Sequence, residues 1–264
     1  MQATVTASPL APGVSPVRVH YRECGGGAPL IILHGGWGYE VYPFDQQVAA
    51  LSRSHRIVIP DRTGYGGSLA IHALPADYHQ RAAEETLALM DALQISQAAL
   101  WGHSDGAVIA LRLALASPAR VRRVVAEATH FLRRKPGSRL FFETMRTAPE
   151  TFGERVVSAL ERDHGDRWRS LLALGGGAWL AIADEAPSAD ADLYDGCLGR
   201  LSVPTLFVHG AKDPRTEPGE LDRLRIALGS APFTLRVFDD GGHSPHSERA
   251  TADAVTAAAR EFLA

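Results

Sequence analysis

The pentapeptide GHSDG at positions 102–106 places a serine hydroxyl where it could act as a nucleophile. It follows the apolar run AALW, which favours a strand, and precedes AVIALRLALA, which favours a helix. A tight strand-to-helix turn holds such a serine in a strained backbone conformation and requires small neighbours. The N-terminus of the following helix favours developing negative charge. The pattern therefore predicts Ser104 as the nucleophile of a covalent mechanism.

A serine hydroxyl is a weak nucleophile and needs a base, usually a histidine that an acid orients. His243 follows the last predicted strand of the chain, and Asp213 follows the strand before it. Because both loops leave the carboxyl ends of strands, the two side chains are expected on the same edge of the sheet as Ser104. The spacing predicts a catalytic triad of Ser104, His243 and Asp213.

Other titratable residues compete for these roles. His246 is close to His243, but Pro245 and the approaching helix make it the weaker candidate base. Asp239 and Asp240 are too near His243 in the sequence to reach it easily from a rigid strand end.

Acyl chemistry also needs donors for the oxyanion. The backbone N–H of Asp105, directly after the nucleophile, is one candidate. The second is expected from the loop HGGWG at 34–38, whose glycines let backbone amides face a ligand. Gly36 is the first choice and Trp37 the alternative, whereas His34 is expected to hold the loop in shape.

The elements that must position these residues alternate between strand and helix patterns. Strands are predicted over 17–21, 30–33, 56–59, 98–101, 121–125, 205–208 and 234–238, and helices over 77–93, 107–116 and 251–263. This alternation predicts an α/β fold with a mostly parallel, doubly wound sheet, which carries ligands at the carboxyl ends of its strands.

The stretch 131–201 interrupts the alternation. It contains helical patterns over 154–161 and 167–174, then Gly175-Gly176-Gly177 and a polar acidic run, but no convincing strand. About 70 residues are too many for a simple connection. We therefore expect a helical cap over 131–201 that acts as a lid, with the core domain formed by 1–130 and 202–264.

Composition and charge exclude several classes of function. The 264 residues are 45% hydrophobic and 22% charged, as in a globular protein, and the net charge of −3 offers no basic field for nucleic acid or an anionic membrane. No run approaches the ~18 apolar residues of a membrane span, and the N-terminus lacks the pattern of a secretory signal. Cys24 and Cys197 form no zinc-binding spacing. We expect a cytoplasmic protein that acts on a small-molecule substrate without metal or cofactor.

The order Ser104, Asp213, His243, with HGGWG upstream and DRTGYGGS at 61–68, resembles the α/β-hydrolase superfamily over nearly the whole chain. The resemblance implies a mostly parallel eight-stranded sheet, a cap inserted after strand 6 and a structural role for the turn at 61–68. Related dehalogenases and epoxide hydrolases use an aspartate where this chain has Ser104. The resemblance therefore implies a serine hydrolase.

Within the superfamily, the GHSDG elbow, the region near Trp168 and VHGAKDP resemble the small esterases related to valacyclovir hydrolase and other biphenyl-hydrolase-like proteins. The segment 127–131 holds no aspartate to match the one that binds a substrate amino group in that group. Ester hydrolysis through an acyl-enzyme is the first interpretation. Hydrolysis of a carbon–carbon bond in a vinylogous diketone, a proline-type aminopeptidase and a small-molecule receptor are the alternatives.

Two sets of residues could set specificity. Aromatic side chains from the loop after the first buried strand and from the cap could line an apolar pocket, and we name Trp37, Phe131, Trp168 and Trp179. A basic run, Arg133, Arg134, Lys135 and Arg139, could meet a carboxylate on the substrate, but a solvated helix face is the stronger interpretation.

Overall fold

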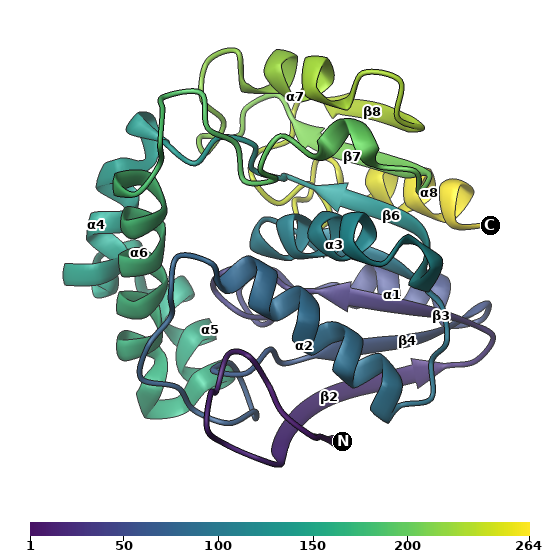
Figure 1. Ribbon diagram of the computed structural model, residues 1–264, viewed down its shortest axis with the longest axis horizontal. Coiled ribbons are helices and arrows are strands. Elements are labelled where there is room, and N and C mark those ends of the chain that lie inside the picture. Colours follow the sequence, from purple (N-terminus) through teal and green to yellow (C-terminus); the bar gives the residue numbers. More distant parts are fainter.

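The computed structural model describes all residues, 1–264, and contains one eight-stranded sheet (Figure 1). Its strands are β1 (Gln2–Val5), β2 (Val17–Gly25), β3 (Ala28–Leu33), β4 (His55–Pro60), β5 (Ala98–His103), β6 (Val121–Glu127), β7 (Thr205–Gly210) and β8 (Phe233–Phe238). Their order across the sheet is β1-β2-β4-β3-β5-β6-β7-β8. β2 is antiparallel to β1 and β4, whereas every pairing from β4 to β8 is parallel. The predicted α/β fold with a mostly parallel sheet is confirmed.

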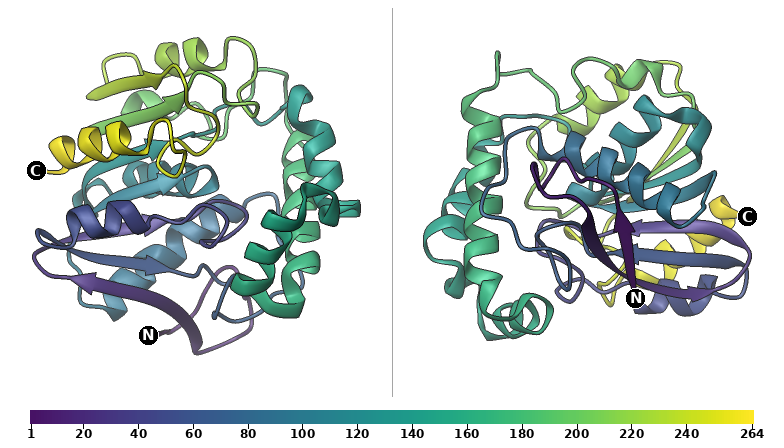
Figure 2. Two further views of the ribbon diagram at one scale, coloured as in Figure 1. Left: turned by 180° about the vertical axis from the view of Figure 1, so that it is seen from behind. Right: turned by 60° about the horizontal axis from the view of Figure 1, so that its bottom comes forward.

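The helices are α1 (Asp45–Leu51), α2 (Tyr78–Ala92), α3 (Asp105–Ala116), α4 (Arg139–Thr147), α5 (Glu154–His164), α6 (Trp168–Asp184), α7 (Glu220–Leu228) and α8 (Ala252–Leu263). Side chains of α2, α3 and α7 pack in one hydrophobic cluster, and those of α1 and α8 in another. Seen from behind in Figure 2, α1 and α8 lie in front of the sheet. The sheet is thus covered on both faces, as a doubly wound fold requires.

The buried strand β3 shows how the sequence divides its side chains between these two layers. Ile31 and Leu33 belong to the cluster with α2 and α3, whereas Leu30 and Ile32 belong to the cluster with α1 and α8. Successive side chains of a strand point to opposite faces, so a continuous apolar run indicates a strand that is buried on both sides.

Helices α4, α5 and α6 lie between β6 and β7 in the chain and fall within the predicted cap, 131–201. The arrows of β3 and β6 in Figure 1 point toward these helices, so the helices stand at the carboxyl ends of the parallel strands. The start of this insertion is tied to α7. The buried Lys135 ammonium donates to both carboxylate oxygens of Glu220 at 2.7 Å, and Glu220 also accepts from the backbone N–H groups of Phe131 and Leu132.

One cap helix differs from the sequence prediction. A helix over 167–174 that ends before three glycines was expected, but α6 continues through them to Asp184. The reason is close packing against α4: a Cβ on Gly176 would lie 2.4 Å from the backbone oxygen of Phe142. The glycines therefore allow two helix backbones to approach each other.

The sequence analysis also missed the short strand β1 and the helices α1, α4 and α7. No helix of the structure combines the length and apolar character that crossing a bilayer demands.

Candidate active site

Ser104 occupies the single residue between β5 and α3. Its backbone torsion angles are φ 54° and ψ −119°, which an L-residue adopts only under strain. The flanking glycines are required by contact: a Cβ on Gly102 would lie 2.1 Å from the oxygen of Gly106, and one on Gly106 would lie 2.0 Å from the oxygen of Leu33. The GHSDG segment therefore forms the sharp strand-to-helix turn that its sequence predicted.

Three loops bring Ser104, His243 and Asp213 into one chain of hydrogen bonds. The Ser104 hydroxyl lies 3.0 Å from His243 Nε2 and can donate its proton there. His243 Nδ1 lies 2.9 and 3.0 Å from the two carboxylate oxygens of Asp213, which accept its N–H. Asp213 comes from the loop after β7 and His243 from the loop after β8. The geometry is that of a nucleophile, a base and an orienting acid.

Asp213 is ionised in this arrangement. Burial by itself would raise its pKa, but the neighbouring His243 ring and the backbone N–H of Arg215 lower the pKa to about 2. A carboxylate that stays charged at neutral pH can hold the imidazole in one tautomer and stabilise the imidazolium.

The competing residues have other partners. His246 is fully buried, and its Nδ1 and backbone N–H both contact Glu127 Oε1, at 2.8 and 2.9 Å. Asp239 and Asp240 are exposed, and Asp240 accepts from Lys212. His34 contacts the oxygen of Gly35 through Nδ1 and accepts from the Arg62 backbone N–H, so it shapes the loop after β3.

The loop after β3 lies against the nucleophile. A Cβ on Gly35 would lie 3.3 Å from Ser104 Cβ, and one on Gly36 would lie 2.7 Å from Asp105 Oδ2. A side chain at either position would force a neighbouring side chain to shift, and the two glycines bring the backbone of residues 35–37 beside the start of α3. Gly36, Trp37 and Asp105 all line one cavity with Ser104.

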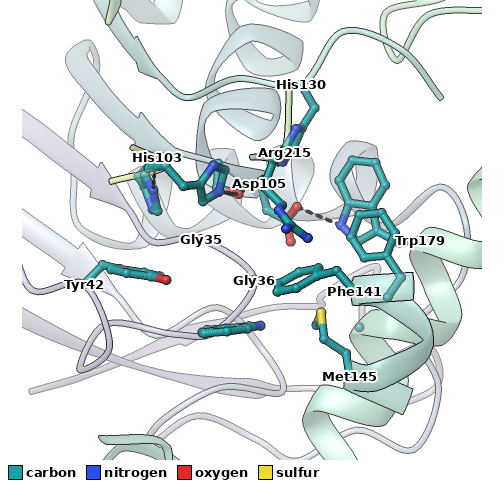
Figure 3. A pocket seen from close by; sticks show the side chains of 15 residues that line it. Gly35, Gly36, Tyr42, His103, Asp105, His130, Phe141, Met145, Trp179 and Arg215 are labelled. Carbon is teal, nitrogen blue, oxygen red and sulfur yellow. Dashed lines mark hydrogen bonds between the residues drawn. The ribbon is translucent and has the colours of Figure 1, made fainter. Parts of the chain in front are cut away.

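That cavity has a volume of about 50 Å³, room for a few water molecules. Figure 3 shows the side chains that enclose it. They are contributed by the β3 loop, the elbow, the cap and the loops after β6, β7 and β8, and comprise Gly35, Gly36, Trp37, Tyr42, His103, Ser104, Asp105, His130, Phe141, Phe142, Met145, Gly175, Trp179, Arg215 and His243.

Two of the four aromatic residues predicted for the pocket do not line this cavity. Trp37 and Trp179 do. Phe131 is buried beside Tyr194, with its backbone held by Glu220, and Trp168 is buried within the cap under the guanidinium of Arg169. Phe131 follows β6 and Trp168 begins α6, but the local chain path turns both away from Ser104.

The basic run at the start of the insertion lies elsewhere too. Arg133 pairs with Asp195, Lys135 with Glu220, and Arg139 with Asp184. Arg134 donates to the backbone oxygen of Ala186. None of the four lines the cavity around Ser104.

A second imidazole, which no sequence pattern marked, lies beside Ser104. His130 Nε2 lies 3.3 Å from Ser104 Oγ, and its ring stacks on that of His243 at 5.6 Å between centroids. Burial, together with the nearby Lys135 and His243, holds the pKa of His130 well below its ordinary value. His130 follows β6 by three residues, and this position after a strand was the one available signal.

The side chain of Asp105 is a buried acceptor below the cavity. Its Oδ1 accepts from His79 Nε2 at 3.3 Å. It also accepts from the Trp179 indole N–H at 3.1 Å (Figure 3). Burial alone would raise the pKa of Asp105, but the bond from His79 and the charge of Arg62 lower it to about 2. Asp105 thereby ties the elbow to α2 and to the cap helix α6.

No cluster of three or more His, Cys, Asp or Glu side chains has the geometry to hold a metal ion. Cys24 and Cys197 are free thiols.

Comparison with known proteins places this chain in a family. A family described as having the alpha/beta hydrolase fold matches residues 28–181, more than half of the chain. The 2-hydroxymuconate semialdehyde hydrolase of Pseudomonas sp. (strain CF600) is 38% identical over 253 residues, covering 89% of this chain and 87% of that protein. The serine hydrolase BPHL of Mus musculus is 29% identical over 247 residues, covering 92% and 81%.

Solved structures agree on the fold. A hydrolase from Pseudomonas aeruginosa PA01 superimposes with a TM-score of 0.75 at 23% identity, covering 99% of this chain and 98% of that one. A thermophilic esterase from Thermogutta terrifontis gives 0.73 at 21% identity, covering 100% and 98%. With the family match over more than half its length, this chain belongs to the α/β-hydrolase superfamily and is one of its hydrolases.

Proposed function

We propose that the protein is a serine hydrolase that cleaves a carboxylic ester of a small, partly apolar substrate. The observation that carries the proposal is the hydrogen-bonded chain from Ser104 through His243 to the ionised Asp213. These are the groups that acyl transfer through a covalent intermediate needs.

In this mechanism Ser104 Oγ attacks the ester carbonyl carbon while His243 Nε2 takes the hydroxyl proton. The backbone N–H groups of Asp105 and Gly36 stabilise the oxyanion, and Trp37 is the alternative to Gly36 as donor. The C–O bond then breaks, and His243 gives its proton to the departing alcohol. Water, deprotonated by His243, attacks the acyl-enzyme, releases the acid and restores Ser104. No metal or cofactor takes part.

The size and lining of the cavity support a small acyl group. About 50 Å³ is enclosed beside Ser104, and the walls facing it include the aromatic rings of Trp37, Phe142 and Trp179. The rings of Phe142 and Trp179 stack at 5.0 Å. A cavity of this size favours short acyl chains over long ones.

The test is an activity screen with p-nitrophenyl esters of increasing acyl length, run on the wild type and Ser104→Ala. Removal of the nucleophile should lower kcat by roughly three or more orders of magnitude. A fluorophosphonate probe should label the wild type at Ser104 and leave the variant unlabelled. Near-normal turnover by a folded Ser104→Ala protein would contradict the mechanism, and tight binding without turnover would favour a receptor.

Hydrolysis of a carbon–carbon bond is the second candidate. It is favoured by the 38% identity to a 2-hydroxymuconate semialdehyde hydrolase. A relative named epoxide hydrolase A is 27% identical, but the chemistry of that class relies on an aspartate where this chain has Ser104. Parallel assays with p-nitrophenyl acetate and a ring-fission dienoate separate the two: the preferred substrate is the one with the higher kcat/KM.

A further inference from the structure

Arg215 supplies a positive charge to the wall of the active-site cavity. It follows the triad residue Asp213 by two positions, and its guanidinium carbon lies 3.9 Å from the centroid of the Phe141 ring (Figure 3). Phe141 comes from cap helix α4, so this contact bridges the core and the cap.

The guanidinium of Arg215 has no polar partner in the protein. Its Nη1 atom is buried and makes no hydrogen bond, and the side chain takes part in no ion pair. The nearby Asp213 carboxylate already accepts from His243 and from the backbone N–H of Arg215. A buried donor on a charged group is costly to leave unsatisfied, and guanidinium remains protonated at all working pH values.

Among the basic side chains near the cap that are not solvent-exposed, Arg215 is the one whose guanidinium has no hydrogen-bond or ion-pair partner. Lys135, Arg133 and Arg139 are each paired with a carboxylate. Arg62, also buried, donates to the backbone oxygens of His34 and Gly35. A carboxylate in the cavity would satisfy this buried donor, because a planar guanidinium matches a carboxylate with two parallel hydrogen bonds.

We propose that Arg215 binds a carboxylate of the substrate, so that the preferred substrates are small esters whose acyl part carries a second, ionised carboxyl group. The inference rests on the proposed ester hydrolysis at Ser104 and adds the substrate class. The acyl part is assigned because it stays attached to Ser104 through both half-reactions, inside the cavity that Arg215 lines. Monoesters of short dicarboxylic acids are the simplest members of this class.

The kinetic test compares monomethyl glutarate with methyl pentanoate, which has the same acyl carbon count and no second carboxylate. The wild type should prefer the charged ester. Arg215→Met should lower kcat/KM for the charged ester by roughly 10- to 100-fold, the range expected for hydrogen bonds to charged groups, mainly through KM. Hydrolysis of methyl pentanoate should change by less than about threefold, because that ester makes no bond to the guanidinium.

Arg155→Met is the matched control. Arg155 is exposed and makes no hydrogen bond or ion pair, yet its charge acts on Tyr42, which lines the same cavity. Removal of the Arg155 charge tests whether the loss of any positive charge near the cavity is sufficient to lower kcat/KM for the charged ester. The preference for the charged ester should persist in this variant.

A binding measurement separates the inference from the proposed function. Monomethyl glutarate should bind to Ser104→Ala, followed by calorimetry, and binding should weaken by roughly tenfold or more in Ser104→Ala/Arg215→Met. If the wild type hydrolyses no ester but this dependence is found, the carboxylate subsite stands and ester hydrolysis fails. If esters are hydrolysed with no preference for the charged one, or if Arg215→Met slows both esters equally, the guanidinium serves only to pack on Phe141 and the inference is overturned.

Discussion

At the scale of single residues, the Ser104 hydroxyl faces two imidazoles that differ in what supports them. His243 Nε2 lies 3.0 Å away, and its Nδ1 is held by a carboxylate. His130 Nε2 lies 3.3 Å away, and no carboxylate contacts this ring. If the hydroxyl donates its one proton to His243, as the proposed mechanism requires, His130 Nε2 is the donor toward Ser104 Oγ.

This difference predicts unequal effects of two matched substitutions. His243→Gln should lower kcat by at least about 10³-fold, because it removes the base that acts as a unit with Ser104. His130→Gln should lower kcat by no more than about tenfold, because glutamine keeps an N–H donor and burial disfavours the imidazolium that would form if His130 took the serine proton. Steady-state kinetics on one ester measures both. Equal losses in the two variants would mean that His130 shares the role of base.

The residue scale also shows what sequence can reveal of a site. The GHSDG pattern indicates Ser104, and positions directly after strands indicate Asp213 and His243; the structure brings the three side chains together. His130 and Arg215 also follow strands and reach the same cavity, but no pattern marked them. The direction of a side chain in an irregular loop depends on the path of the loop, which tertiary contacts decide.

At the scale of elements, α6 shows why three glycines do not always end a helix. Gly176 faces α4, where a Cβ would lie 2.4 Å from the Phe142 oxygen and 3.0 Å from the Arg146 nitrogen. A Cβ on Gly177 would meet nothing within 4 Å. The two neighbours therefore have the same helix propensity and opposite surroundings.

We expect Gly176→Ala and Gly177→Ala to change stability in opposite directions. Gly176→Ala should lower the free energy of unfolding by about 1–3 kcal/mol, because the backbones of α4 and α6 must separate. Gly177→Ala should raise it by about 0.4–1 kcal/mol through helix propensity. Urea unfolding at neutral pH gives both values. Stabilisation by Gly176→Ala would show that α4 and α6 can move apart at little cost in free energy.

The strong periodic patterns of the sequence predicted seven of the eight strands, whereas short elements were missed. β1 has four residues and α1 has seven, too few for a period to stand out from its surroundings. α4 and α7 have nine residues each and depend on tertiary packing, since isolated helices of this length are marginal. The elements that the sequence patterns did not predict are thus those that packing against neighbouring elements stabilises.

At the scale of the whole molecule, buried titratable groups link stability to pH. Burial lowers the pKa of His34 and of His103 to about 3. His103 Nε2 lies 3.0 Å from the backbone oxygen of His243, and the ring also lines the cavity. The pKa values of Asp213 and Asp105 are each lowered to about 2, so these carboxyl groups affect stability at lower pH than the histidines do.

The buried histidines and the buried carboxylates destabilise the fold in two different pH ranges as the pH falls. Each histidine titrates near 6.5 in the unfolded chain, so between about pH 6.5 and 3 the unfolded state binds the extra proton. Stability is therefore complete above this window and falls as the pH decreases through it. The carboxylates stabilise the fold above about pH 4, and their contribution is lost as the pH falls from about 4 toward 2.

We predict a steep loss of stability between pH 6.5 and 5, above the range in which Asp213 and Asp105 titrate in the folded protein. The slope from each buried histidine approaches about 1.4 kcal/mol per pH unit once its unfolded form is protonated, so the free energy of unfolding should fall by about 3 kcal/mol over this interval for His34 and His103 together. Urea unfolding at several pH values measures the slope.

His103→Gln should reduce this slope by about 1.4 kcal/mol per pH unit, whatever its effect on stability at pH 7. His72→Gln, at an exposed position, is the control and should keep the wild-type slope. An unchanged slope in His103→Gln would mean that the buried ring takes up its proton in the folded state, and the cavity wall beside His243 would then carry a charge at pH 5.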